Sequence, residues 1–146
     1  MTIQPRQLET ESNGTGKRMF ECEVIEKGIL GAKKLCVKGD YSIKLPFTCA
    51  DAIITDTIGL LHGDLLLAKG YIWKGASFIT YDTENSFEAT AVHDALYTIL
   101  KIFDNNEFTR KQADKLFYKL LRKNGMCYLR ARGWYRAVRT GGSFYV

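Results

Sequence analysis

The chain has 146 residues, of which 46% are hydrophobic and 25% charged, and its formal charge is +5. With only two prolines, the composition is not that of a linker. The length fits one globular domain, which can bury a core without disulfide bonds or a structural metal. Four separated cysteines and two histidines argue against a zinc site, and the most apolar stretch, residues 53–68, is broken by aspartates and glycines, which excludes a membrane span.

The N-terminal segment is polar, contains Pro5, Gly14 and Gly16, and has little periodicity. We predict an extended arm over residues 1–18, followed by a single α+β domain over residues 19–146. The arm lacks the apolar core of a secretory signal, so we expect the chain to be made in the cytoplasm.

Apolar and polar residues alternate through much of residues 19–81, a pattern typical of half-buried strands. Gly39-Asp40 and Lys69-Gly70 predict tight hairpin turns between neighbouring strands. Residues 53–61 fit either a strand or a short helix. The alternation predicts strands at 20–24, 35–38, 41–45, 65–68 and 71–73, with one more short strand at 77–81.

After Ser86 the apolar period changes to that of a helix, with Val92, Leu96, Ile99 and Phe103 on one face. Ser86 is the expected N-cap of this helix, and residues 105–106 are the expected stop. Thr109 and Gln112 form a capping-box pattern that predicts the start of a second helix. Gly125 is placed to end that helix.

Residues 126–139 predict a third helix, closed by Gly141-Gly142. Because the strands come first and the helices follow, we predict an α+β fold. Its expected architecture is a small, mostly antiparallel sheet in the N-terminal half, followed by three helices.

One group of polar residues has the composition of a catalytic site. His93 and Tyr97 are four residues apart and share a helix face, with Asp94 about 100° further round. A short loop makes the next helix an antiparallel neighbour, so Asp114 can face His93. An imidazole can take a proton from water, a carboxylate can fix its tautomer, and a second carboxylate can hold a hard cation. The alternative is a histidine satisfied at the edge of the core.

The segments His93-Asp-Ala-Leu-Tyr97 and Ala113-Asp-Lys-Leu-Phe117 resemble the two-helix core of secretory phospholipases of the A-two class, and most closely the compact version carried by parvovirus capsids. The resemblance implies His93 as general base and Asp94 as calcium ligand. It implies that Asp114 orients the histidine, with Tyr97 in support.

A wider resemblance, over residues 64–140, is to a small uncharacterised family common in tailed-bacteriophage genomes. It is carried by the segments 68–77, 93–97, 109–114 and 134–139, which include a Gly-Ala-Ser turn. It implies a tail-region or accessory protein of the virion, made in the host cytoplasm. Its expected partners are other phage structural proteins or further copies of itself, and lysis or anti-defence roles stay open.

The turn before the first helix departs from both patterns. Lys74 stands where the phage family has an acid, and a lysine aimed at Asp94 and Asp114 would neutralise them and repel a cation. Gly75 is the only sign of a carbonyl-lined calcium loop, so calcium is possible but disfavoured by Lys74. Ser77 lines the expected site but lacks the strand-Ser-helix setting of a nucleophile.

Residues 119–139 contain seven basic residues and no acidic one. Arg130, Arg132, Arg136 and Arg139 predict a basic face, which is either simply solvated or binds an anionic partner. No nucleic-acid signature accompanies these charges, so nucleic acid is not the expected partner. We predict a virion-associated protein, in the tail region or as an accessory structural protein, that carries the phospholipase-like His/Asp helix pair. The alternatives are a small hydrolase of lipid or cell-wall esters or amides with His93 as base, and a basic binding module.

Overall fold

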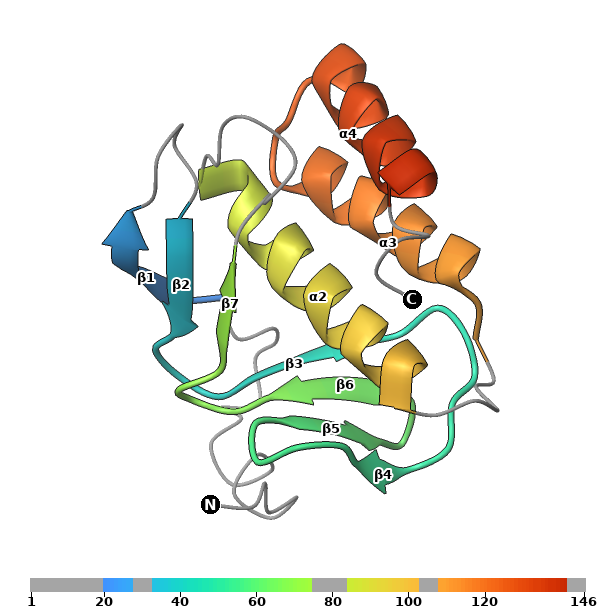
Figure 1. Ribbon diagram of the computed structural model, residues 1–146. Helices are drawn as coiled ribbons and strands as arrows, with labels where there is room; N and C mark the ends of the chain where they lie inside the picture. Colours follow the sequence, from blue (N-terminus) through green and yellow to red (C-terminus); the bar gives the residue numbers. More distant parts are fainter. Residues whose placement is uncertain (1–19, 28–32, 75–83, 103–107, 142–146) are drawn as a thin grey trace.

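The computed structural model describes residues 20–27, 33–74, 84–102 and 108–141. The predicted arm at 1–18, the strand at 77–81, the helix stop at 105–106 and Gly142 lie outside these residues. Within them, seven strands precede three α-helices, which confirms the predicted α+β fold (Figure 1). In this described part of the chain, no helix is long and apolar enough to cross a bilayer.

The strands form two antiparallel sheets instead of one. The first has the order β1-β2-β7 and the second the order β3-β6-β5-β4. Their bounds are β1 Cys22–Lys27, β2 Lys33–Val37, β3 Tyr41–Lys44, β4 Ala52–Ile53, β5 Ile58–Leu61, β6 Asp64–Leu67 and β7 Ile72–Lys74. The ambiguous segment 53–61 therefore contains strand β5 and the end of strand β4.

The two predicted hairpins are wrong, because each turn carries the chain from one sheet to the other. Gly39-Asp40 connects β2 to β3, and Lys69-Gly70 connects β6 to β7. The two crossings lie side by side: the Gly70 amide donates to the Val37 carbonyl at 2.9 Å, and the Lys69 amide donates to the Asp40 carboxylate at 2.7 Å. A turn signal marks a local reversal of the chain, but it does not decide which strands pair.

A hairpin that the sequence analysis missed joins β5 to β6. Its two turn residues, His62 and Gly63, have φ values of 51° and 79°. Left-handed backbone at both positions matches the right-handed twist of the flanking strands. The histidine at the first position hid this turn, since glycine and asparagine are the usual signals.

The helices follow the predicted order. Helix α2 spans Phe87–Ile102 after the short 3-10 helix η2, Glu84–Ser86. Helix α3 spans Arg110–Lys123, and the predicted capping box of Thr109 and Gln112 is present.

Helix α4 spans Tyr128–Gly141, two residues later than predicted at its start. Met126 is used to close α3 instead: its amide donates to the Leu121 carbonyl at 3.0 Å. The preceding Gly125 has a φ of 92°, so the two residues complete the hydrogen bonds of a Schellman motif.

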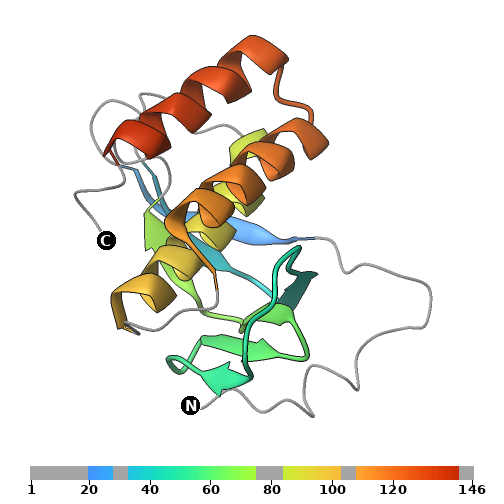
Figure 2. The same ribbon diagram turned by 90° about the vertical axis from the view of Figure 1, so that its right-hand side faces the viewer.

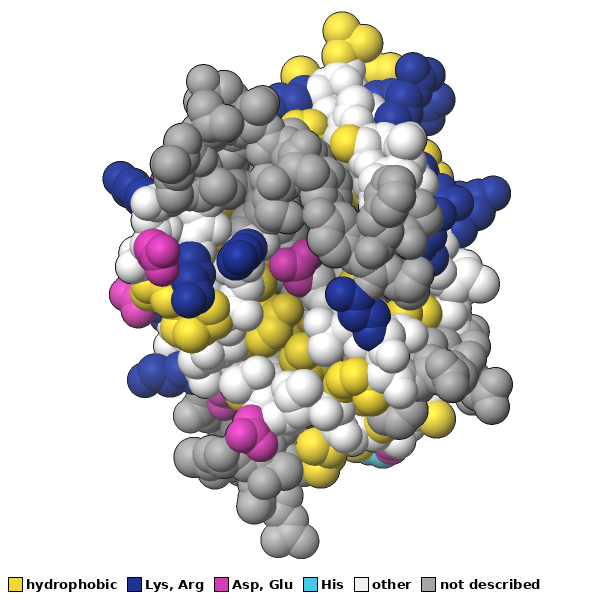
Figure 3. All heavy atoms as spheres, in the orientation of Figure 1, with side chains coloured by type: hydrophobic (Ala, Val, Ile, Leu, Met, Phe, Trp, Pro, Cys, Tyr) yellow, Lys and Arg dark blue, Asp and Glu magenta, His cyan; other side chains and the backbone are white. Residues whose placement is uncertain are grey.

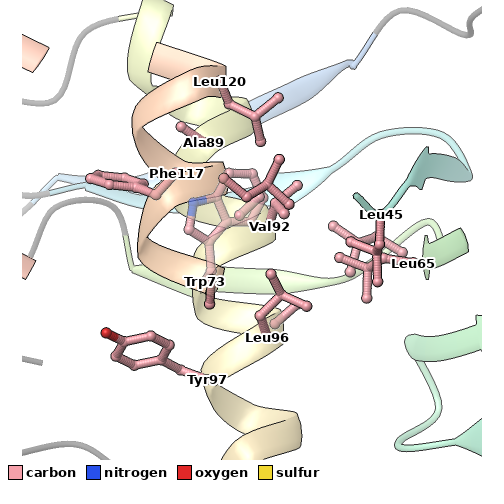
Figure 4. Packing of buried hydrophobic residues seen from close by; sticks show 14 of the residues in the cluster. Leu45, Leu65, Trp73, Ala89, Val92, Leu96, Tyr97, Phe117 and Leu120 are labelled. Atoms are coloured by element: carbon pink, nitrogen blue, oxygen red, sulfur yellow. The ribbon is translucent and has the colours of Figure 1, made fainter. Parts of the chain in front are cut away.

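Figures 1 and 2 show α2 between the strands and α3, with α4 packed on α3. Trp73 ties strand β7 to α2, because its indole N–H donates to the Thr90 hydroxyl at 2.9 Å. Figure 4 shows Trp73, Val92, Leu96 and Phe117 in one apolar cluster, with the hydroxyl of Tyr97 directed away from it. The middle of α2 is thus held on one side by the strands and on the other by α3.

Candidate functional site

His93 lies in the middle of α2 and is almost wholly enclosed, with 6% of its side chain exposed. The ring centroid of Tyr97 lies 4.1 Å from that of the imidazole, and the ring centroid of Phe117 lies 4.7 Å away. The spacing of four residues puts His93 and Tyr97 on one face of α2, and α3 contributes Phe117. Two aromatic rings therefore restrict the orientation of the imidazole.

Asp114 connects α3 to this face of α2. Its Oδ1 lies 2.6 Å from His93 Nε2, and the Tyr97 hydroxyl donates to the same oxygen at 2.5 Å. Because an ionised carboxylate only accepts hydrogen bonds, Nε2 carries the proton when the ring is neutral, and Nδ1 is left as the proton acceptor. The sequence pattern predicts that His93, Tyr97 and Asp114 can lie near one another, and the structure places them in contact.

The carboxyl of Asp114 is fully buried. Burial by itself raises its pKa, but hydrogen bonds from His93, Tyr97 and Arg139 outweigh burial, and the pKa lies below its ordinary value. Burial and the bond to Asp114 raise the pKa of the Tyr97 hydroxyl. The site thus combines an ionised aspartate with a neutral, hydrogen-bonded tyrosine.

Arg139, which the charge pattern assigns to the basic face, also reaches the site. Its side chain is 31% exposed, and its Nη1 donates to Asp114 Oδ2 at 2.7 Å. Arg110 Nη1 lies 3.7 Å from the same oxygen. The spacing of four residues from Arg110 to Asp114 was a visible signal, whereas Arg139 is 25 residues away from Asp114 and only tertiary packing brings it there.

The other three arginines of the predicted face are partly or fully exposed on α4. Arg130 lies over the Trp134 ring at 5.1 Å and Arg132 over the Tyr128 ring at 5.9 Å. Arg136 is exposed. Figure 3 shows further Lys and Arg side chains on the right-hand side of the molecule, over α3 and α4. The exposed basic side chains thus lie on both α3 and α4.

Lys74 does not take the neutralising position that the sequence analysis gave it. It is exposed at the end of β7, two residues after exposed Ile72, whereas Trp73 between them is buried and bonded to α2. Since side chains alternate along a strand, Lys74 points to the face of β7 away from α2. Arg139 and Arg110 balance the charge of Asp114 instead.

Asp94 lies one residue beyond His93 and is partly buried. It is close enough to Tyr71 to add to the effect of burial in raising the pKa of that hydroxyl. The Asp94 backbone carbonyl accepts a hydrogen bond from Thr98. Gly75 and Ser77, the other predicted lining residues, lie outside the described residues.

A calcium ion takes six to eight oxygen ligands. Of the two carboxylates predicted for this site, Asp114 already contacts His93, Tyr97 and Arg139, and Asp94 has interactions of its own. No group of three or more His, Cys, Asp or Glu side chains that could hold a metal occurs in the described ranges. The described side chains of this site therefore supply fewer oxygen ligands than a calcium ion takes.

A second buried carboxylate escaped the sequence analysis. Glu88 accepts hydrogen bonds from the Tyr41 hydroxyl and, at 2.8 Å, from Asn124 Nδ2, and Lys123 Nζ lies 3.2 Å away. Burial raises its pKa, but these three partners outweigh burial and lower it. Glu88 is four residues before Val92, so extending the apolar stripe back one turn would have placed it on the buried face. It joins β3, α2 and the end of α3 away from His93.

Residues 73–138 match the model of a family described as "Protein of unknown function (DUF1353)". The matched segment begins at Trp73, includes His93, Asp94, Tyr97 and Asp114, and ends one residue before Arg139. This is a similarity to an uncharacterised family over less than half of the chain. No curated protein and no solved structure matches the chain significantly.

Proposed function

We propose that this chain is a small hydrolase of ester or amide substrates in which His93 is the general base. The observation that carries the proposal is the 2.6 Å contact between His93 Nε2 and Asp114 Oδ1, which leaves Nδ1 to accept a proton. Asp114 also accepts hydrogen bonds from Tyr97 and Arg139, so its carboxylate is held in one position against His93 Nε2.

The proposed reaction uses residues of this chain alone. Nδ1 of His93 takes a proton from water while the water oxygen attacks the carbonyl carbon of the substrate. Asp114 stabilises the imidazolium that forms. The imidazolium then gives its proton to the leaving oxygen or nitrogen as the bond to the carbonyl carbon breaks. Because Tyr97 and Phe117 flank the ring, the substrate must reach its edge.

His93→Gln tests this proposal. We expect kcat on a cleaved lipid or cell-wall ester or amide to fall about 10²- to 10⁴-fold, which is the usual contribution of a general base. The matched control is His62→Gln, since His62 is exposed in the β5-β6 turn and should leave turnover unchanged. The proposal is wrong if His93→Gln keeps the activity, or if it lowers the melting temperature strongly and no substrate in either class is cleaved by the wild type.

The resemblance to tailed-phage proteins supports a place for this activity in the virion, bound to other structural proteins or to further copies of the chain. Stoichiometric recovery of the protein from purified particles tests that placement. Its absence from them would remove the placement without touching the proposed chemistry.

A binding module for an anionic partner is the second candidate, and one observation favours it. The outer side of α3 carries exposed basic residues at intervals of four, four and three, which is the spacing of one helix face. We name these residues the α3 basic stripe: Lys111, Lys115, Lys119 and Arg122. The acidic residue of α3, Asp114, is buried and therefore does not offset the stripe.

Removing two charges from the α3 basic stripe tests this candidate. For Lys115→Gln/Lys119→Gln we expect weaker binding to heparin, used as a model polyanion, and a slope of log affinity against log salt reduced by about one per lost contact. Lys34→Gln/Lys74→Gln, on the first sheet, changes the net charge equally and is the control. Equal weakening by both pairs would show a general charge effect and would reject the stripe as a binding site.

A further inference from the structure

We infer that Arg139 is a positioning residue of the His93–Asp114 pair, so that the site is built from three helices and α4 is one of them. The effect of Arg139 on catalysis rests on the proposed hydrolase function. Its effect on the geometry of the His93–Asp114 pair does not depend on that function. The predicted catalytic residues all lie on α2 and α3, and the family match ends at Val138.

The two oxygens of Asp114 have separate partners. Oδ1 accepts from Tyr97 and faces His93 Nε2, whereas Oδ2 accepts from Arg139 at 2.7 Å. A carboxylate with 0% exposure cannot replace a lost partner with bulk water. Without Arg139, Oδ2 would have to turn toward another donor, and Oδ1 would leave its position at Nε2.

Arg110 does not duplicate Arg139. At 3.7 Å from Oδ2 it is beyond hydrogen-bond distance, and its Nη1 donates instead to the carbonyls of Val138 and Arg139 at 3.3 and 3.2 Å. These carbonyls belong to the last turn of α4, where a cation is favourable. Arg110 therefore holds the backbone from which Arg139 reaches Asp114.

Arg139 also differs from the arginine one turn before it. Arg136 is exposed on α4, whereas the side chain of Arg139 is 31% exposed and directed to a buried acid. The pair Arg139 and Arg136 thus gives a matched comparison: the same residue type, on the same helix, with and without contact to the site.

Nitrogen-15 NMR of the full-length protein gives a readout that does not need a substrate. The chain has two histidines, so His62→Gln assigns the ring signals of His93. We expect a slowly exchanging Nε2–H signal from His93 in the wild type and in Arg136→Gln. In Arg139→Gln this proton should exchange at least about tenfold faster, which corresponds to about 1.4 kcal/mol. Arg139→Lys should restore part of the protection.

The indole N–H of Trp73 is the internal control, since it is hydrogen-bonded to Thr90 and lies outside the site. A purely structural role for Arg139 would speed exchange at Trp73 as much as at His93. That result, or unchanged exchange of His93 in Arg139→Gln, would overturn the inference.

Kinetics separate this inference from the proposed function. With a cleaved substrate, Arg139→Gln should lower kcat about 10- to 100-fold with little change in KM, as expected for a group that orients a catalytic residue. If the wild type cleaves nothing while the NMR result holds, the hydrolase proposal fails and the positioning role stands. If the wild type cleaves a substrate and Arg139→Gln does so equally well, Arg139 has no effect on catalysis, and the hydrolase proposal stands without it.

Discussion

Asp114→Asn is expected to lower the free energy of unfolding by about 3 kcal/mol at neutral pH. The substitution keeps the shape of the side chain but removes the charge that Arg139 and Arg110 balance. It also puts an amide N–H₂ or a weaker acceptor against His93 and Tyr97. Because Arg139 is 31% exposed and can regain water, we place the loss at the lower end of the range for a broken buried pair. Urea denaturation followed by circular dichroism measures it.

The same pair of proteins gives a pH test. The pKa of Asp114 is lowered in the folded protein, so its contribution to stability is complete above the unfolded pKa and is lost as the pH falls through the folded one. Below about pH 4 the wild type should therefore lose stability faster than Asp114→Asn. Glu88 is present in both proteins, so its own acid loss cancels. Parallel curves would show that Asp114 is not held as a carboxylate.

Asp64→Asn is the control for a carboxylate without a buried network of donors. Asp64 is 38% exposed, its Oδ1 accepts no hydrogen bond, and its ion pair with Lys44 is long, at 3.8 Å. Exposed pairs contribute between zero and about 1 kcal/mol, so the loss should be several times smaller than at Asp114. If the two substitutions lower the free energy of unfolding equally, the buried contacts of Asp114 add no stability beyond that of an exposed pair.

Trp73→Ala is expected to lower the free energy of unfolding by about 4 kcal/mol. The indole is 3% exposed, packs edge-on against Phe20 and stacks on Tyr71, with centroid distances of 5.7 and 5.8 Å. Its N–H holds Thr90 of α2. Truncation therefore removes the ring that fills the space between the first sheet and α2. The urea midpoint at constant slope measures the loss.

Trp73→Phe separates the ring from its hydrogen bond. Phenylalanine keeps most of the apolar contact and loses the bond to Thr90, which still donates to the Phe87 carbonyl. We expect a loss of about 1 to 2 kcal/mol, from the hydrogen bond and the smaller ring. If Trp73→Phe is as damaging as Trp73→Ala, the hydrogen bond and not the packing dominates this contact.

Local patterns were sufficient for most of the secondary structure. The capping box at Thr109 and the apolar stripe of α2 depend on residues three or four apart, so the sequence contains all the interacting partners. The pairing of strands could not be predicted in this way. Gly39-Asp40 and Lys69-Gly70 are turns in the structure, but the strands they join belong to different sheets. Which strands pair depends on contacts between residues far apart in the sequence, which a local turn signal does not contain.

The sequence by itself determined the α+β order and the shared helix face of His93 and Tyr97, because these depend on element order and on helical spacing, whereas it left the contact with Asp114 as one possible arrangement. Only the tertiary structure decided that Arg139 contacts Asp114 and that Lys74 faces away from α2. A long, flexible side chain on a helix is free to reach solvent or a neighbouring acid. Whether the Arg139 side chain reaches solvent or Asp114 depends on how α4 packs on α3. The packing angle between two helices cannot be read from the periodicity of the sequence.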